Sequence, residues 1–130
     1  MNEKFFDAAL NGDIDTVKQL IAEKVDVNEK DDLGATALMC AAYEGHAEVV
    51  KLLIDAGAEV NEKDKWGRTA LMEAIRNGNA KVVKLLIDAG AMVNEKNGWG
   101  FTPLREAAVW GHTEVVEADI VELLKQHGAT

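Results

Sequence analysis

The sequence contains a single cysteine, Cys40, so no disulfide can form within the chain. Cys40 falls on the apolar side of a predicted helix, where we expect it to act as a small buried hydrophobic side chain rather than as a reactive thiol. One cysteine is compatible with a reducing compartment but does not require one.

Long apolar segments are also missing. No run of apolar residues approaches the ~20 that span a bilayer, so we expect no membrane partner. The first residues of the sequence, 1–7, lack the apolar core of a secretory signal peptide. The sequence therefore predicts a cytoplasmic location.

Basic residues are few compared with acidic ones, since the chain has 14 Lys and Arg against 23 Asp and Glu and a net charge of −9. Proteins that bind nucleic acids use clustered cations to displace the counterions of the phosphates. No basic stripe can be assembled here, so we expect no nucleic-acid partner. We interpret the acidic excess as a source of solubility.

What the sequence does contain is a unit of 33 residues that recurs. Residues 31–63 read D-D-L-G-A-T-A-L-M-C-A-A-Y-E-G-H-A-E-V-V-K-L-L-I-D-A-G-A-E-V-N-E-K. Residues 64–96 read D-K-W-G-R-T-A-L-M-E-A-I-R-N-G-N-A-K-V-V-K-L-L-I-D-A-G-A-M-V-N-E-K. A period of about 20–50 residues is typical of stacked repeats, in which no unit can bury its apolar face alone.

Each unit predicts two helices and a connecting loop. A threonine suits the N-cap position before the first apolar run, where its hydroxyl takes a helix-start N–H; these are Thr36, Thr69 and Thr102. Glycines that can adopt a left-handed backbone end the helices; these are Gly45, Gly78 and Gly111 for the first helix and Gly57 and Gly90 for the second. Asn28, Asn61 and Asn94 share one loop position, and we expect each to tie down its own loop by side-chain hydrogen bonds.

With these features the sequence resembles the ankyrin-repeat family. The matching segments are G-A-T-A-L-M-C-A-A from Gly34, G-H-A-E-V-V-K-L-L-I from Gly45 and A-G-A-E-V-N from Ala56, and they recur in the next two units. The family's usual T-P-L-H reads T-A-L-M, T-A-L-M and T-P-L-R here. The resemblance implies an all-α solenoid of stacked helix-turn-helix units with projecting loops or hairpins, which acts as a non-catalytic protein-interaction module.

We expect one domain, residues 1–130, built from four units: an N-terminal capping repeat (1–30), two full repeats (31–63 and 64–96) and a modified C-terminal repeat (97–130). In the first unit, Lys24 stands where later units have Gly57 and Gly90. A residue with a side chain tolerates the left-handed backbone poorly. We therefore expect this helix to end differently from its equivalents.

The last unit carries a five-residue insertion near Glu117 and Val121, because Gly128 follows Gly111 by 17 residues where the full repeats have 12. One arrangement is a single lengthened helix, which we favour because an apolar stripe survives; its members are Val116, Ile120, Leu123, Leu124 and His127. The other arrangement aligns Ile120 and Val121 with Val49 and Val50 and leaves residues 112–117 in a longer turn.

Motifs for catalysis or metal binding are missing. The sequence shows no Gly-rich phosphate loop and no recognisable nucleophile motif. His46 and His112 occupy equivalent positions in units two apart, too distant for one metal ion, whose ligand atoms lie about 2 Å away. The carboxylates look scattered over solvated faces, with no pair that burial would drive to different pKa values. We therefore expect no enzyme, no cofactor and no metal site.

All three tryptophans and the only tyrosine fall outside the repeated apolar framework. In the ankyrin family the loop and first-helix positions form a concave partner-binding surface, so the resemblance implies that a protein partner contacts Leu33, Tyr43, Trp66, Arg68, Arg76, Trp99, Phe101 and Trp110. Tryptophan, tyrosine and arginine dominate interface energetics, each worth about 2 kcal/mol or more. The alternative is that the aromatic rings pack against neighbouring loops and stiffen the stack.

The expected function is partner binding by a monomeric or weakly self-associating chain. Two other interpretations stay open. The chain could be an engineered or consensus-like scaffold without a natural ligand, because residues 82–90 repeat the preceding unit closely. It could also be a regulatory or inhibitory subunit of an enzyme, since a fold by itself does not assign a function.

Overall fold

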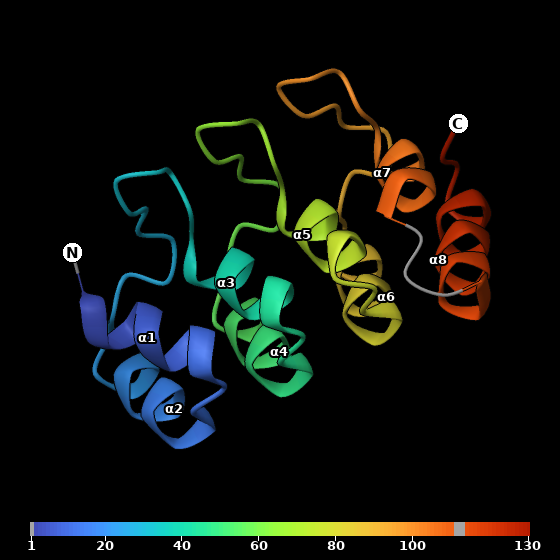
Figure 1. The fold of residues 1–130 in the computed structure, drawn as a ribbon. Coiled ribbons are helices and arrows are strands. Elements are labelled where there is room, and N and C mark those ends of the chain that lie inside the picture. Colours follow the sequence, from blue (N-terminus) through green and yellow to red (C-terminus); the bar gives the residue numbers. More distant parts are fainter. Residues whose placement is uncertain (1, 111–113) are drawn as a thin grey trace.

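The computed structural model describes residues 2–110 and 114–130, and over these residues the chain is all-helical. Eight described helices form four pairs that stack side by side into a solenoid, with the two ends of the chain at opposite ends of the stack (Figure 1). The helices are α1 (Glu3–Asn11), α2 (Ile14–Ala22), α3 (Ala37–Glu44), α4 (Ala47–Asp55), α5 (Ala70–Arg76), α6 (Ala80–Asp88), α7 (Pro103–Trp110) and α8 (Glu114–Gln126). The expected all-α repeat solenoid is confirmed.

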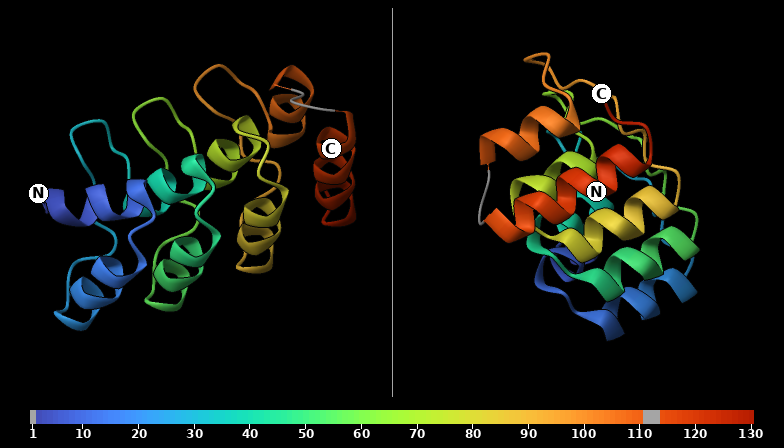
Figure 2. Two further views of the ribbon diagram at one scale, coloured as in Figure 1. Left: turned by 60° about the horizontal axis from the view of Figure 1, so that its bottom comes forward. Right: turned by 90° about the vertical axis from the view of Figure 1, so that its right-hand side faces the viewer.

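The helices lie in two layers, with the core between them. Helices α1, α3, α5 and α7 contact one another in series, and so do α2, α4, α6 and α8 (Figure 2). Apolar residues spaced three or four positions apart turn one side of each helix inward. Val50, Leu53 and Leu86 are fully buried on the second layer, and Leu38 and Leu71 on the first. Each such side chain stabilises the stack by about 1.5–3 kcal/mol.

In the three units after the first, the first helix begins at a threonine, as expected. Oγ1 of Thr36 accepts from the backbone N–H of Met39, and Thr69 and Thr102 do the same one and two units later, each at 3.3 Å. Gly45 ends α3 with φ 78°, a left-handed backbone. Gly111, its predicted equivalent in the last unit, lies outside the described residues.

The side chains of Asn28, Asn61 and Asn94 join neighbouring units. The expectation that each ties down its own loop is therefore wrong. Nδ2 of Asn28 donates to the Gly57 carbonyl at 3.2 Å, and Oδ1 accepts from the Glu59 N–H at 2.7 Å. Asn61 and Asn94 repeat these two contacts with the next helix end. The reason is that a helix C-terminus leaves carbonyls unpaired. Each asparagine lies beside the C-terminal end of the second helix in the following unit.

Lys24 also departs from expectation. Its backbone is left-handed, with φ 66°, as at Gly57 with φ 96°. Its N–H donates to the Ile21 carbonyl at 3.0 Å, just as Gly57 donates to Ile54 at 3.0 Å. The first unit therefore ends its second helix in the same way as the others. The two backbone hydrogen bonds that close this helix end, from Lys24 to Ile21 and from Val25 to the Leu20 carbonyl at 3.0 Å, form despite the steric cost of a side chain in this conformation.

The last helix is continuous from Glu114 to Gln126, 13 residues against nine in α6, which confirms the single lengthened helix over the described residues. Ile120 and Leu124 are buried where α6 buries Val82 and Leu86. The added residues therefore lengthen the N-terminal end of the helix. His127 is exposed, so its assignment to the apolar stripe is wrong. The side chain of Val116 lies outside the described part.

None of the helices in the described part of the chain is both long and apolar enough to cross a membrane.

Candidate functional site

Three finger loops (residues 29–35, 62–68 and 95–101) project beyond the first helix layer (Figure 1). We call these loops, together with α1, α3, α5 and α7, the inner surface. One side chain organises each loop. Oδ1 of Asp64 accepts from the N–H groups of Trp66 and Arg68, both at 2.9 Å. Asn97 holds Trp99 and Phe101 in the same way, at 2.8 and 3.0 Å. These local turns fix the backbone from which the predicted site residues project.

The loops are also tied to one another. The N–H of Lys65 donates to the Leu33 carbonyl at 2.8 Å, and the N–H of Gly98 donates to the Trp66 carbonyl at 2.7 Å. A Cβ on Gly98 would lie 2.8 Å from that carbonyl oxygen, so a larger residue at this position would require a local shift of the loop. The loops therefore stack in a fixed register along the inner surface.

A pocket of about 310 Å³ opens on the inner surface between α5, α7 and two finger loops. Five predicted site residues line it: Arg68, Arg76, Trp99, Phe101 and Trp110. Five residues that the sequence interpretation missed complete the lining: Met72, Glu73, Asn97, Glu106 and Val109. Trp99 is 64 % exposed and Trp110 is 42 % exposed, so both rings face solvent at the pocket.

The other predicted site residues lie outside the pocket. Leu33 and Tyr43 are exposed on the preceding unit. Trp66 is half-buried under the guanidinium of Arg68, whose Cζ lies 4.8 Å from the ring centroid. The structure therefore brings together five of the six predicted residues of the last two units and leaves Leu33, Tyr43 and Trp66 outside the pocket.

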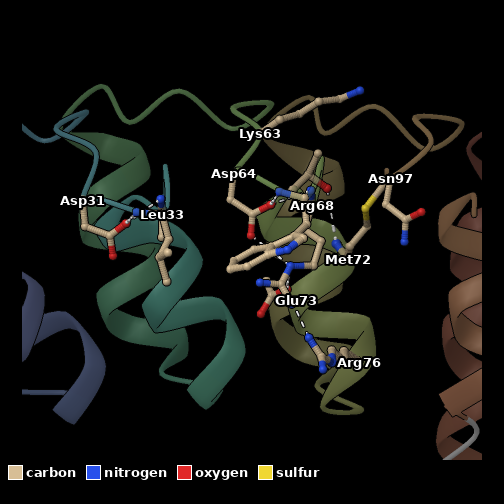
Figure 3. A network of polar contacts seen from close by, with 12 residues as sticks. Asp31, Leu33, Lys63, Asp64, Arg68, Met72, Glu73, Arg76 and Asn97 are labelled. Atoms are coloured by element: carbon tan, nitrogen blue, oxygen red, sulfur yellow. Dashed lines mark hydrogen bonds and ion pairs between the residues drawn. The ribbon is translucent and has the colours of Figure 1, made fainter. Parts of the chain in front are cut away.

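One side of the pocket is held by an ion-pair network around Glu73 (Figure 3). Nε of Arg68 lies 2.9 Å from Oδ2 of Asp64 and 3.4 Å from Oε1 of Glu73. Nη1 of Arg76 lies 3.9 Å from the same Glu73 oxygen. Although it has these ionic neighbours, buried Oε1 of Glu73 accepts no hydrogen bond from any described residue. Glu73 thus draws two arginines to the same wall of the pocket.

The other side is held by Glu106, which is buried and hydrogen-bonded at both oxygens. Oε1 accepts from Nδ2 of Asn97 and Oε2 accepts from the indole N–H of Trp110, each at 2.7 Å. Hydrogen bonds to a carboxylate are short and about twice as strong as neutral ones. This pair of contacts locks the Trp110 ring and the loop that carries Trp99 against α7.

These carboxylates correct the sequence interpretation, which placed acidic groups on solvated faces. Burial raises the pKa of Glu73 above its ordinary value of 4.5, and the nearby Arg68 and Arg76 offset part of that effect. A signal was available, because Cys40, Glu73 and Glu106 share one unit position on the first helix. A position that is partly buried in one unit is partly buried in the others.

Cys40 itself is half-buried rather than fully buried. Burial raises the pKa of its thiol to about 11, which is the direction expected for a structural cysteine rather than a reactive one.

Every arginine in the sequence lies beside an aromatic ring at this site. Arg76 Cζ is 4.9 Å from the Trp110 centroid, and Arg105 Cζ is 4.9 Å from that of Phe101. Arg68 stacks over Trp66 in the same manner. Such cation–π contacts are worth about 0.5–1 kcal/mol at exposed sites. They hold long side chains in place along the rim of the pocket.

Across residues 2–110 and 114–130, no three His, Cys, Asp or Glu side chains converge in a way that could hold a metal ion. The pocket presents aromatic rings, guanidinium groups and buried carboxylates on fixed supports.

Comparison with known families identifies the class of protein. The sequence model of the family described as "Ankyrin repeats (3 copies)" matches residues 5–97 and again residues 56–130. The chain therefore belongs to the ankyrin-repeat family. Ankyrin repeats generally act in protein–protein interactions and are typically not catalytic. A comparison with curated proteins finds no match.

Proposed function

We propose that this chain binds a protein partner on its inner surface and that the pocket between α5 and α7 is the main anchoring site. The observation that carries the proposal is the exposure of Trp99 and Trp110 at the edge of a preformed pocket. Tryptophan is among the residues most enriched at the energetic centres of protein interfaces. An exposed aromatic cluster of this kind is a feature of interaction sites.

The supports of the pocket favour tight recognition. Asn97 and Glu106 are buried, and they hold the finger loop and α7 in one arrangement. Binding to a surface that is already ordered loses less conformational entropy than binding to a mobile one. The stacked loops and paired arginines extend this ordered surface toward the preceding unit.

Affinity capture of partners from a source lysate tests the proposal, with the intact chain compared to two variants. Trp99→Ala removes the most exposed aromatic ring at the pocket. Met92→Ala is the matched control, because Met92 is 55 % exposed and does not line the pocket. We expect specific partners to be retained by the wild type and Met92→Ala and lost with Trp99→Ala. Equal retention by Trp99→Ala would contradict the proposal.

A further inference from the structure

Around the pocket the acidic side chains are buried, whereas the arginine side chains reach the surface. The side chains of Asp64 and Glu73 are only 5 % and 11 % exposed, and Glu106 is buried. The side chain of Arg76 is 33 % exposed, and Arg105 is exposed. A molecule that approaches this part of the inner surface therefore meets cations first.

The buried acids are already engaged. Asp64 pairs with Arg68 at 2.9 Å, and Glu73 lies within ion-pair distance of Arg68 and Arg76. Both oxygens of Glu106 accept hydrogen bonds. These carboxylates are paired with groups of the same chain, and a ligand would have to break those contacts to reach them. Arg105, on the rim over Phe101, has no such carboxylate contact among the described residues.

The pocket between these cations is apolar on its walls. Met72, Phe101, Val109 and the rings of Trp99 and Trp110 line it. A volume of about 310 Å³ is at the low end of ligand-binding pockets, which span roughly 300–1,000 Å³. It suits a single large side chain inserted from an extended segment rather than a packed helix pair.

We propose that the segment this pocket receives is acidic: an apolar side chain enters between Trp99 and Trp110, and flanking Asp or Glu carboxylates pair with Arg105 and Arg76. The inference rests on the proposed function and names the chemistry of its partner. Arginine presents a planar fork of N–H donors that matches a carboxylate with two hydrogen bonds. Rings beneath the guanidinium groups hold that fork at the rim.

The net charge of −9 favours the opposite kind of partner at long range. At physiological ionic strength, however, exposed charges farther apart than about 8 Å are largely screened. Contacts at the pocket are then decided by the charged groups on and beside its lining, where Arg105 is exposed and the side chain of Arg76 is 33 % exposed. A basic segment would bring like charges against both, which is unfavourable.

Selection of short random peptides displayed on phage against the intact chain tests the inference. We expect the enriched peptides to carry Asp and Glu beside Leu, Phe or Trp. Their binding should weaken by about tenfold in Arg105→Glu, which reverses one rim charge. The matched control is Lys81→Glu, the same charge change at an exposed position on α6, where binding should change by less than about twofold. Circular dichroism confirms that both variants are folded.

The outcomes separate this inference from the proposed function. Enriched peptides that need Trp99 but are basic or neutral would overturn the acidic partner and leave the binding site intact. An equal loss in Arg105→Glu and Lys81→Glu would also overturn it, since the effect would then be one of net charge. Peptides that bind Trp99→Ala as well as the wild type would overturn both proposals. A dimer that Trp99→Ala dissociates in sedimentation would identify a second copy as the occupant and would also overturn the acidic-segment inference.

Discussion

Nδ2 of Asn97 donates a hydrogen bond of 2.7 Å to Oε1 of Glu106, and both side chains are buried. The same two unit positions hold Asp64 and Glu73 one unit earlier. Two acids are tolerated there because Arg68 lies within 3.4 Å of both. Phe101 replaces Arg68 in the last unit and brings no cation, so a neutral amide at position 97 is the compatible partner for Glu106.

Replacing Asn97 with aspartate tests this pairing. Asn97→Asp removes the donor and places a second acid against buried Glu106. Leaving a buried group without its hydrogen bond costs about 1–3 kcal/mol, and a like charge adds to that. We therefore expect the free energy of unfolding in urea to fall by about 2 kcal/mol at neutral pH. The double variant Asn97→Asp with Glu106→Gln should recover most of the loss, and an unchanged midpoint in the single variant would refute the pairing.

The stability of the chain should depend on the protonation of Glu73. Burial raises the pKa of this carboxyl in the folded state above 4.5, so the folded chain binds the proton more tightly than the unfolded chain. The stabilising contribution is fully present below about pH 4.5 and is lost as the pH rises through the folded-state pKa. Wild type should therefore gain stability relative to Glu73→Gln as the pH falls from neutral. Urea midpoints across this pH range measure the difference in stability between wild type and Glu73→Gln, with exposed Glu48→Gln as control. A difference that does not change with pH would contradict the expectation.

The two exposed tryptophans at the pocket should differ in their effect on stability. Trp99→Ala alters a ring that is 64 % exposed, and surface changes usually stay within about ±0.5 kcal/mol. Trp110→Ala removes the indole N–H that donates to Glu106 at 2.7 Å, which should cost about 1–3 kcal/mol. Trp110→Phe keeps a ring and loses only the donor. Urea unfolding of the three variants measures the difference; equal midpoints for both alanine variants would show that the Glu106 contact adds nothing.

The left-handed backbone at Lys24 predicts a stabilising substitution. A side chain in this conformation costs about 1–2 kcal/mol, whereas glycine loses about 0.5–1 kcal/mol of chain entropy on folding. Lys24→Gly should therefore raise the free energy of unfolding by about 0.5–1 kcal/mol. Gly57→Lys is the reciprocal control and should lower it, because φ is 96° there and nothing else crowds a Cβ. A Lys24→Gly variant with a lower melting temperature would show that the lysine side chain makes a compensating contact.

A deletion in the last unit should be tolerated only if it keeps apolar residues at the buried positions of the last helix. Deleting residues 117–121 gives Val115 and Val116 the spacing from Gly128 that Val82 and Val83 have from Gly90, so the chain should stay folded. Deleting only residues 119–121 puts Glu117 at the position of buried Ile120 and should cost several kcal/mol. Urea midpoints of the two variants provide the comparison. Equal stability would mean that the last helix does not depend on this register.

Local signals were sufficient to predict the architecture. Threonine N-caps, helix-ending glycines and apolar spacing act within a few residues of one another, and their recurrence every 33 residues specifies a stack. The loop and first-helix positions of Arg68, Arg76, Trp99, Phe101 and Trp110 could also be singled out, because they vary against that regular background. Lys24 shows the limit of such signals, since it adopts the left-handed backbone that glycine adopts at the equivalent positions 57 and 90.

The composition of the pocket was decided by the tertiary structure. Glu73 and Glu106 lie at one unit position, but their burial and their partners depend on which side chains the neighbouring loops bring across the stack. Arg68 supplies a cation in one unit and Phe101 supplies none in the next, so the same fold position is satisfied by different chemistry. The asparagine contacts follow the same rule, because each joins a loop to the helix end of the following unit. A repeat pattern specifies position along the stack, whereas electrostatic and hydrogen-bond partners are chosen in space, among residues that the chain brings together only when it folds.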